Sequence, residues 1–247
     1  MLPTTRLALK AVLFDLDDTL IDHQQSFRGA LRRLWDTYPV FKQKPFATLE
    51  TLHSQLLEAL HQQVLAGQLT FEASRRKRFF ELFLRYGVKL SQTDAEAASA
   101  VYRQAYLAAE CPIPGAVAFL DYLRGQGIAI GVITNSTTVE QYDKVRRCGL
   151  HHLIDELVIS EEVGVIKPNP AIFQLALSRL GCHPEDTVMI GDSWECDIVG
   201  ALGAGIPALW LNRYARPCPD ARFAQEFHGY EPPEMVVAAI LKTITRV

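Results

Sequence analysis

The chain has 247 residues, enough for one large domain or two modest ones with a core that needs no staples. Hydrophobic residues make up 49% and charged residues 21%, which excludes an intrinsically disordered protein, and a net charge of −3 gives no electrostatic case for binding nucleic acid. Apolar runs such as residues 128–133 are too short to cross a bilayer, and the N-terminus shows no signal-peptide pattern. We therefore expect no membrane partner.

The five cysteines are spread widely, and no two of them form a C-x-x-C pair. An odd, scattered set argues against a disulfide framework and against a zinc site. The cysteines are those expected in a reducing compartment, so we expect a cytoplasmic protein.

The first predicted element is a buried strand over Leu9–Phe14, because that run is apolar on both faces. From residue 22 to residue 111 the pattern changes to apolar residues at helical spacing, with no strong β-run. About four helices are predicted there, with breaks near Pro39–Pro45, Gly67–Thr70 and Gly87–Thr93.

After Gly115 helices and apolar strands alternate along the chain. The predicted helices span 116–125, 138–148, 171–180 and 197–204, and the predicted strands span 128–133, 154–159, 187–190 and 207–211. Such alternation is typical of a doubly wound parallel α/β sheet. The lone first strand must join that sheet, so we expect an α/β core from residues 1–21 and 112–247 and an inserted all-helical domain from 22–111.

Polar residues follow the carboxyl ends of several predicted strands, where open parallel sheets bind their ligands. They lie far apart in the sequence but are expected to converge on one crevice: Asp15 and Asp17, Thr134-Asn135-Ser136, Lys167, and Asp192-Ser193 with Asp197. Several carboxylates in one crevice repel each other unless a divalent cation compensates them, and hard oxygen ligands suit Mg²⁺.

Such a set of groups can perform phosphoryl transfer. A carboxylate can attack phosphorus to form an aspartyl-phosphate, and a second carboxyl can protonate the leaving oxygen and then activate water. Lys167 would supply a fixed positive charge, and Thr134 with the N–H groups around it would hold phosphate oxygens. Taken alone, Asp15 could end a strand in a turn and Thr19 could cap the next helix.

These segments occur in the order of the four motifs of the haloacid dehalogenase (HAD) superfamily, which the chain resembles over nearly its whole length. The matching segments are residues 15–20 (DLDDTL), 134–136 (TNS), 167–168 (KP) and 191–197 (GDSWECD). The resemblance implies a HAD-like Rossmannoid core, with a helical type-1 cap inserted after the first motif.

The resemblance also implies a role for each matching residue. Asp15 corresponds to the nucleophile, and Asp17 to the general acid/base whose main-chain carbonyl binds Mg²⁺. Thr134 and Asn135 correspond to phosphate-binding residues, and Lys167 to the lysine of the third motif. Asp192 corresponds to a metal ligand, while Ser193 and Asp197 belong to the fourth motif as metal ligands or as groups that support the metal site and Lys167. Phe27 and Arg28, just after the first motif, are candidate substrate contacts from the cap.

The leading interpretation is a Mg²⁺-dependent phosphatase of a small phosphorylated metabolite. A haloacid dehalogenase of the same fold needs no metal, and its branch typically lacks an acid at the position of Asp17. A phosphosugar mutase keeps that acid and stays open, as does a non-catalytic regulatory protein, although the complete set of motif residues argues against the latter. The sequence specifies neither the phosphate ester nor the oligomeric state.

Overall fold

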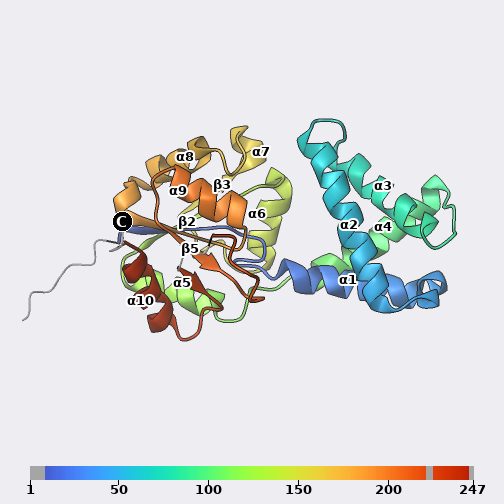
Figure 1. Ribbon diagram of the computed structural model, residues 1–247, viewed down its shortest axis with the longest axis horizontal. Helices are drawn as coiled ribbons and strands as arrows, with labels where there is room; N and C mark the ends of the chain where they lie inside the picture. The colour runs from blue at the N-terminus through green and yellow to red at the C-terminus, as the bar shows by residue number, and fades with distance from the viewer. Residues whose placement is uncertain (1–8, 221–224, 245–247) are drawn as a thin grey trace, which may run out of the picture. The chain divides into compact units, whose positions relative to one another are not determined.

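The computed structural model describes residues 9–220 and 225–244. The chain divides into two compact units, the core unit from the described parts of Met1–Asp22 and Cys111–Val247, and the helical unit from His23–Glu110 (Figure 1). The predicted insertion, 22–111, differs from the helical unit by one residue at each end. The predicted stretches 1–8 and 245–247 lie outside the described residues.

The core unit contains a six-stranded sheet in which every neighbouring pair of strands is parallel. The strands lie in the order β3-β2-β1-β4-β5-β6. Their bounds are β1 Ala11–Phe14, β2 Ala129–Thr134, β3 Glu156–Ile159, β4 Thr187–Gly191, β5 Ala208–Leu211 and β6 Glu226–Phe227. The predicted fold class, a doubly wound parallel α/β sheet, is confirmed.

Helices cover both faces of this sheet (Figure 1). Successive strand side chains point to opposite faces, so Val12 and Phe14 pack in one apolar cluster with α5, α6 and α10, while Leu13 packs in another with α8 and α9. The helices of this unit are α5 Ala116–Gly125, α6 Thr138–Arg147, α7 Ser160–Val163, α8 Pro170–Leu180, α9 Gly200–Gly203 and α10 Pro233–Ile244.

The strand order reverses beside β1. The chain runs from β1 to β2 and β3 on one side and then crosses to β4 on the other side of β1. In open α/β sheets such a topological switch point opens a crevice outside the carboxyl ends of the two strands. The segments that leave β1 and β4 are therefore the natural place for a site.

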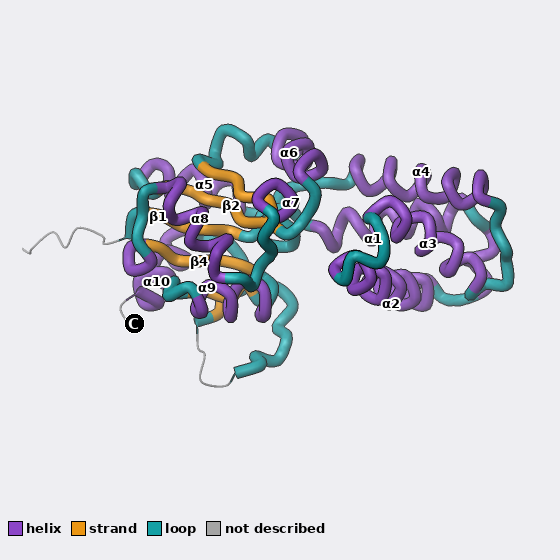
Figure 2. Tube along the Cα trace, turned by 90° about the horizontal axis from the view of Figure 1, so that it is seen from above, coloured by secondary structure: helices purple, strands orange, loops and turns teal. Residues whose placement is uncertain are grey.

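The helical unit contains no strand among its described residues (Figure 2). Its four helices agree with the number and breaks predicted from the sequence: α1 His23–Thr37, α2 Phe46–Leu65, α3 Phe71–Leu84 and α4 Gln92–Ala108, with a 3₁₀ turn at Pro39–Gln43. Thr70 and Ser91 begin α3 and α4 as N-caps, each accepting a hydrogen bond from a backbone N–H three residues later. Within the described residues, no helix of either unit is both long and apolar enough to cross a membrane.

A buried histidine lies in the core of the helical unit. The His53 ring is fully buried, stacks on Tyr102 at 5.1 Å between centroids and lies 5.0 Å from Phe27. Neither ring nitrogen has a hydrogen-bond partner among the described residues. Burial, together with the positive charge of Arg78 and the nearby His23, holds the pKa of His53 well below its ordinary value of 6.5.

We expect His53 to make the protein less stable in acid. The pKa of His53 is lower in the folded state, so below about pH 6.5 this histidine is protonated in the unfolded chain but not in the folded chain. The free energy of unfolding therefore falls as the pH drops below about 6.5. The slope from this residue is up to about 1.4 kcal/mol per pH unit. Between pH 6.5 and 5, His53→Phe should reduce the pH dependence of the unfolding free energy measured by urea denaturation. His151→Phe, at an exposed histidine, should leave that pH dependence unchanged. An unaltered slope in His53→Phe would contradict the assignment.

Candidate active site

The register of β1 against β4 brings the first and fourth sequence motifs together. Phe14 pairs with Ile190, and the N–H of Asp15 donates to the carbonyl of Ile190 at 2.9 Å. Both strands end at this level of the sheet, so Asp15 and Asp192 leave their strands side by side although they are far apart in the sequence.

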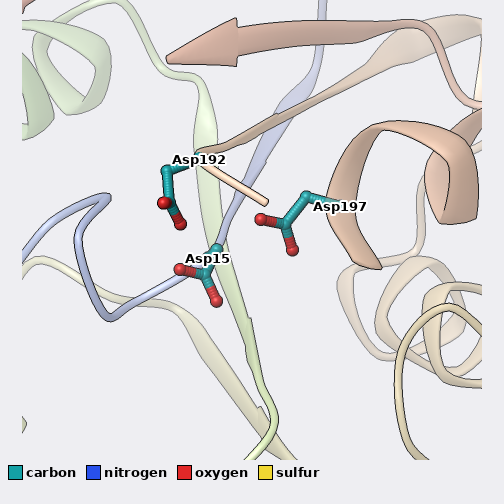
Figure 3. Close-up of side chains that lie close together, drawn as sticks. All are labelled: Asp15, Asp192 and Asp197. Carbon is teal, nitrogen blue, oxygen red and sulfur yellow. The ribbon is translucent and has the colours of Figure 1, made fainter. Parts of the chain in front are cut away.

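Three carboxylates converge at this edge of the sheet, those of Asp15, Asp192 and Asp197 (Figure 3). One oxygen from each lies within 4.8 Å of the others. Asp197 is fully buried and Asp15 nearly so, while the Asp192 side chain is 23% exposed. An all-oxygen set that is partly open to solvent suits a hard divalent cation such as Mg²⁺ or Mn²⁺.

Lys167 joins two of these carboxylates. Its Nζ lies 2.6 Å from Oδ1 of Asp15 and 2.7 Å from Oδ1 of Asp197, and its side chain is only 2% exposed. Burial by itself lowers the pKa of Lys167, but the carboxylates of Asp15 and Asp197 outweigh burial and raise this pKa above its ordinary value. The lysine is therefore a permanent cation at the centre of the site.

Lys167, together with the half-exposed Arg216 that lies 3.4 Å from Asp192, does not fully neutralise three carboxylates. Burial, with Asp197 and Asp192 nearby, raises the pKa of Asp15 well above its ordinary value although Lys167 opposes the shift. Burial and the charges of Asp197 and Asp18 raise the pKa of Asp192 to about 7. Raised carboxyl pKa values mark an excess of buried negative charge, which a divalent cation would relieve. The residues present thus fit a divalent metal.

The Asn135 side chain holds the backbone of Lys167 in place. The Asn135 amide donates to the carbonyl of Lys167 at 3.0 Å, and its Oδ1 accepts the Lys167 N–H at 2.8 Å. The predicted phosphate contact of Asn135 stays a prediction.

Asp17 points to a different set of partners. Its Oδ1 lies 2.5 Å from Nζ of Lys144, and its Oδ2 accepts from Nε2 of Gln141 at 3.1 Å. Gln141 also donates to the hydroxyl of buried Thr134 at 3.3 Å. The first and second motifs are therefore linked by one amide. Sequence analysis missed Gln141 and Lys144, although their spacing of three within the helix after the second motif was a readable signal.

Thr19 supports Asp192 and does not cap a helix. The following helix, α1, begins only at His23, and the Thr19 hydroxyl instead accepts the N–H of Asp192 at 3.1 Å. Arg216, also missed by sequence analysis, donates to the carbonyl of Asp192 at 2.9 Å. Both contacts fix the loop that carries Asp192.

Ser193 shapes the turn that carries Asp197. Its N–H donates to Oδ2 of Asp197 at 3.0 Å, and its hydroxyl accepts from the N–H of Cys196 at 3.4 Å. The helical segment starts with a π-helical turn at Trp194–Val199, three residues before the predicted start at Asp197, because Ser193 caps it. Asp197 thus lies inside the turn and faces Lys167.

The two candidate cap residues lie in the helical unit. Phe27 belongs to the apolar core of that unit, and Arg28 is exposed and pairs with Glu50 at 2.7 Å. Their assignment as substrate contacts stays a prediction.

The fold and the site together define a class of protein: a doubly wound α/β enzyme-like core with an acidic, metal-fitting site at its switch point and a helical insertion after the first strand. Residues 9–205 match the family model of haloacid dehalogenase-like hydrolases. The chain belongs to this family.

Named relatives are similar over most of the chain. A glyceraldehyde 3-phosphate phosphatase from Methanopyrus kandleri is 35% identical over 83% of this chain and 84% of its own length. The pyrimidine 5′-nucleotidase YjjG from Escherichia coli is 34% identical over 85% and 88%. The solved structure of the HAD-hydrolase YfnB from Bacillus subtilis, bound to magnesium, is 26% identical, with a TM-score of 0.74 over 94% of this chain and 98% of that one.

The site leaves no room for a side chain at Gly191. A Cβ added there would overlap the Cβ and carboxyl of Asp197. We expect Gly191→Ala to displace Asp197 and with it the ion pair to Lys167, costing about 3 kcal/mol of stability or more, as when a buried charge loses its partner. Chemical denaturation would measure this cost.

Gly203→Ala is the matched control, because nothing lies within 4 Å of a Cβ added there. A Gly191→Ala protein with wild-type stability would contradict this account of Asp197.

Proposed function

We propose that the protein is a Mg²⁺-dependent phosphatase that hydrolyses a small phosphate monoester through an aspartyl-phosphate on Asp15. The observation that carries the proposal is the arrangement of Asp15 against Lys167, Asp192 and Asp197 at the switch point. The names of the relatives, which include phosphatases and a nucleotidase, support the same reaction class.

In the first step an oxygen of Asp15 attacks phosphorus, and the bond from phosphorus to the ester oxygen breaks. Lys167 holds the Asp15 carboxylate through Oδ1 and balances negative charge on the phosphoryl oxygens. Asp17 gives a proton to the departing oxygen. A bound Mg²⁺, held by the carboxylates of Asp15 and Asp192 and the carbonyl of Asp17, would supply further charge neutralisation.

In the second step Asp17 takes a proton from a water molecule whose oxygen attacks the phosphorus. The bond between phosphorus and Asp15 breaks, which releases phosphate and restores the carboxylate. Thr134 is suited to hold a phosphoryl oxygen, because its hydroxyl accepts a hydrogen bond from Gln141 and so keeps its own proton to donate. The helical unit would act as a cap that excludes water and selects the leaving group.

Asp15→Asn should abolish phosphate release from p-nitrophenyl phosphate, with a fall in kcat of at least about 10³-fold because the nucleophile is lost. Melting temperature and circular dichroism would establish that the variant folds. Asp186→Asn, at an acid outside the site that pairs with Lys10, is the matched control and should keep wild-type activity. Turnover by Asp15→Asn near the wild-type rate would overturn the mechanism.

Removal of divalent metal with EDTA should abolish turnover of the wild type, and added Mg²⁺ should restore it. Full activity after exhaustive chelation would contradict the role given to the metal. Metal-independent release of chloride from 2-chloropropionate, without phosphate release from any ester, would instead identify a dehalogenase.

A panel of phosphorylated metabolites would identify the substrate. Glyceraldehyde 3-phosphate and pyrimidine 5′-nucleotides come first, because the named relatives act on them. Hydrolysis with kcat/KM well above that for p-nitrophenyl phosphate identifies the natural class. Isomerisation of a phosphosugar without free phosphate would indicate a mutase.

A further inference from the structure

Two buried polar side chains of α6 face the first motif. Gln141 is fully buried and Lys144 is 7% exposed, and their spacing of three places them on one side of the helix. Val145, the next residue, packs in the apolar cluster on this side of the sheet. Positions at such a boundary are ordinarily apolar, so an amide and an ammonium there need an explanation.

Both side chains bind the same carboxylate. Lys144 contacts Oδ1 of Asp17 at 2.5 Å, and Gln141 donates to Oδ2 at 3.1 Å, so each oxygen has its own partner. The Lys144 side chain is 9% exposed, whereas that of Asp17 is 32% exposed. The carboxylate therefore reaches toward solvent while its two partners anchor it from the protein side.

The arrangement does not optimise stability. The Oε1 atom of Gln141 is buried without a hydrogen-bond partner in the described chain, and Nε2 instead spans Asp17 and Thr134. An unsatisfied buried oxygen and a buried ammonium both carry a desolvation cost that apolar residues would avoid. The cost is consistent with a role in placing Asp17.

We propose that Lys144 and Gln141 are positioning residues that fix the carboxyl group of Asp17 for proton transfer; this inference rests on the phosphatase function proposed above. Lys144 holds Oδ1, and the longer contact from Gln141 leaves Oδ2 as the oxygen that gives and takes the proton. In the first step the proton moves from Oδ2 to the ester oxygen as that oxygen leaves phosphorus. In the second it returns to Oδ2 from the attacking water.

A cation near the site can act by positioning Asp17 or by contacting the substrate. Substrates with different leaving groups distinguish these two roles. A proton donor matters greatly when the leaving group is a weak acid such as phenol and little when it is a much stronger acid such as p-nitrophenol. The second step, hydrolysis of the aspartyl-phosphate, is the same for both esters, so the comparison uses kcat/KM, which reports only the steps up to departure of the alcohol. Loss of a residue that acts through Asp17 therefore lowers kcat/KM selectively for phenyl phosphate. Loss of a residue that contacts the substrate raises KM for both esters.

The experiment measures kcat and KM for phenyl phosphate and p-nitrophenyl phosphate, with Mg²⁺, in wild type, Lys144→Met and Lys144→Arg. For Lys144→Met we expect kcat/KM to fall at least about tenfold with phenyl phosphate and less than about threefold with p-nitrophenyl phosphate, since general acid catalysis contributes about 10²-fold or more. Lys144→Arg, which keeps the charge, should recover most of the loss.

Gln141→Met keeps the shape of the side chain and provides a second test that does not alter charge. It should show the same selectivity for phenyl phosphate, with a smaller fall in rate. Asp17→Asn should show this selectivity most strongly, and Asp17→Asn/Lys144→Met should be no slower than Asp17→Asn, because Lys144 acts only through the Asp17 carboxyl group. Arg146→Met removes a charge from the exposed side of the same helix and should match wild type.

Several results would overturn the proposal. An equal fall in kcat/KM for both esters, or a further loss when Lys144→Met is added to Asp17→Asn, would show that Lys144 does not act through Asp17. Wild-type kinetics in both Lys144→Met and Gln141→Met would do the same. Failure of the wild type to release phosphate from either ester would contradict the phosphatase function itself, a result distinct from these.

Discussion

The site depends on one buried ammonium. Lys167 lies between the carboxylates of Asp15 and Asp197, and it allows both to stay at the carboxyl ends of the strands without solvent. Without this cation two buried carboxylates would face each other uncompensated, and one of them would have to take up a proton. The rest of the local structure serves this pairing: Asn135 fixes the lysine backbone, and Ser193 fixes Asp197.

The charge left after this pairing explains why the site suits a metal. Asp192 is the most exposed of the three acids, and burial with the charges of Asp197 and Asp18 raises its pKa to about 7 although Arg216 lies 3.4 Å away. Asp17 is different, because its carboxylate has its own lysine on α6. Two acids two residues apart are thereby given separate cations, which is consistent with the separate tasks proposed for them.

The fold was predictable wherever the sequence pattern was long and periodic. The predicted helices of the insertion, the parallel sheet and the polar strand ends all rest on runs of several residues whose period is fixed by helix or strand geometry. The single-turn α7 and the two-residue β6 carry no such period, so the sequence could not indicate them. The contact of the Thr19 hydroxyl with the Asp192 N–H could not be predicted either, because the two residues are distant in the chain.

The sequence by itself determined the identity of the acidic residues and that they follow strands, because residue type and hydrophobic period are local properties. Only the tertiary structure decided which charges pair. The register of β1 against β4 placed Asp15 beside Asp192. The packing of α6 placed Lys144 beside Asp17, while Lys167 pairs with Asp15. Coulombic interaction falls with distance in space and with solvent access, and neither quantity can be read from spacing along the chain.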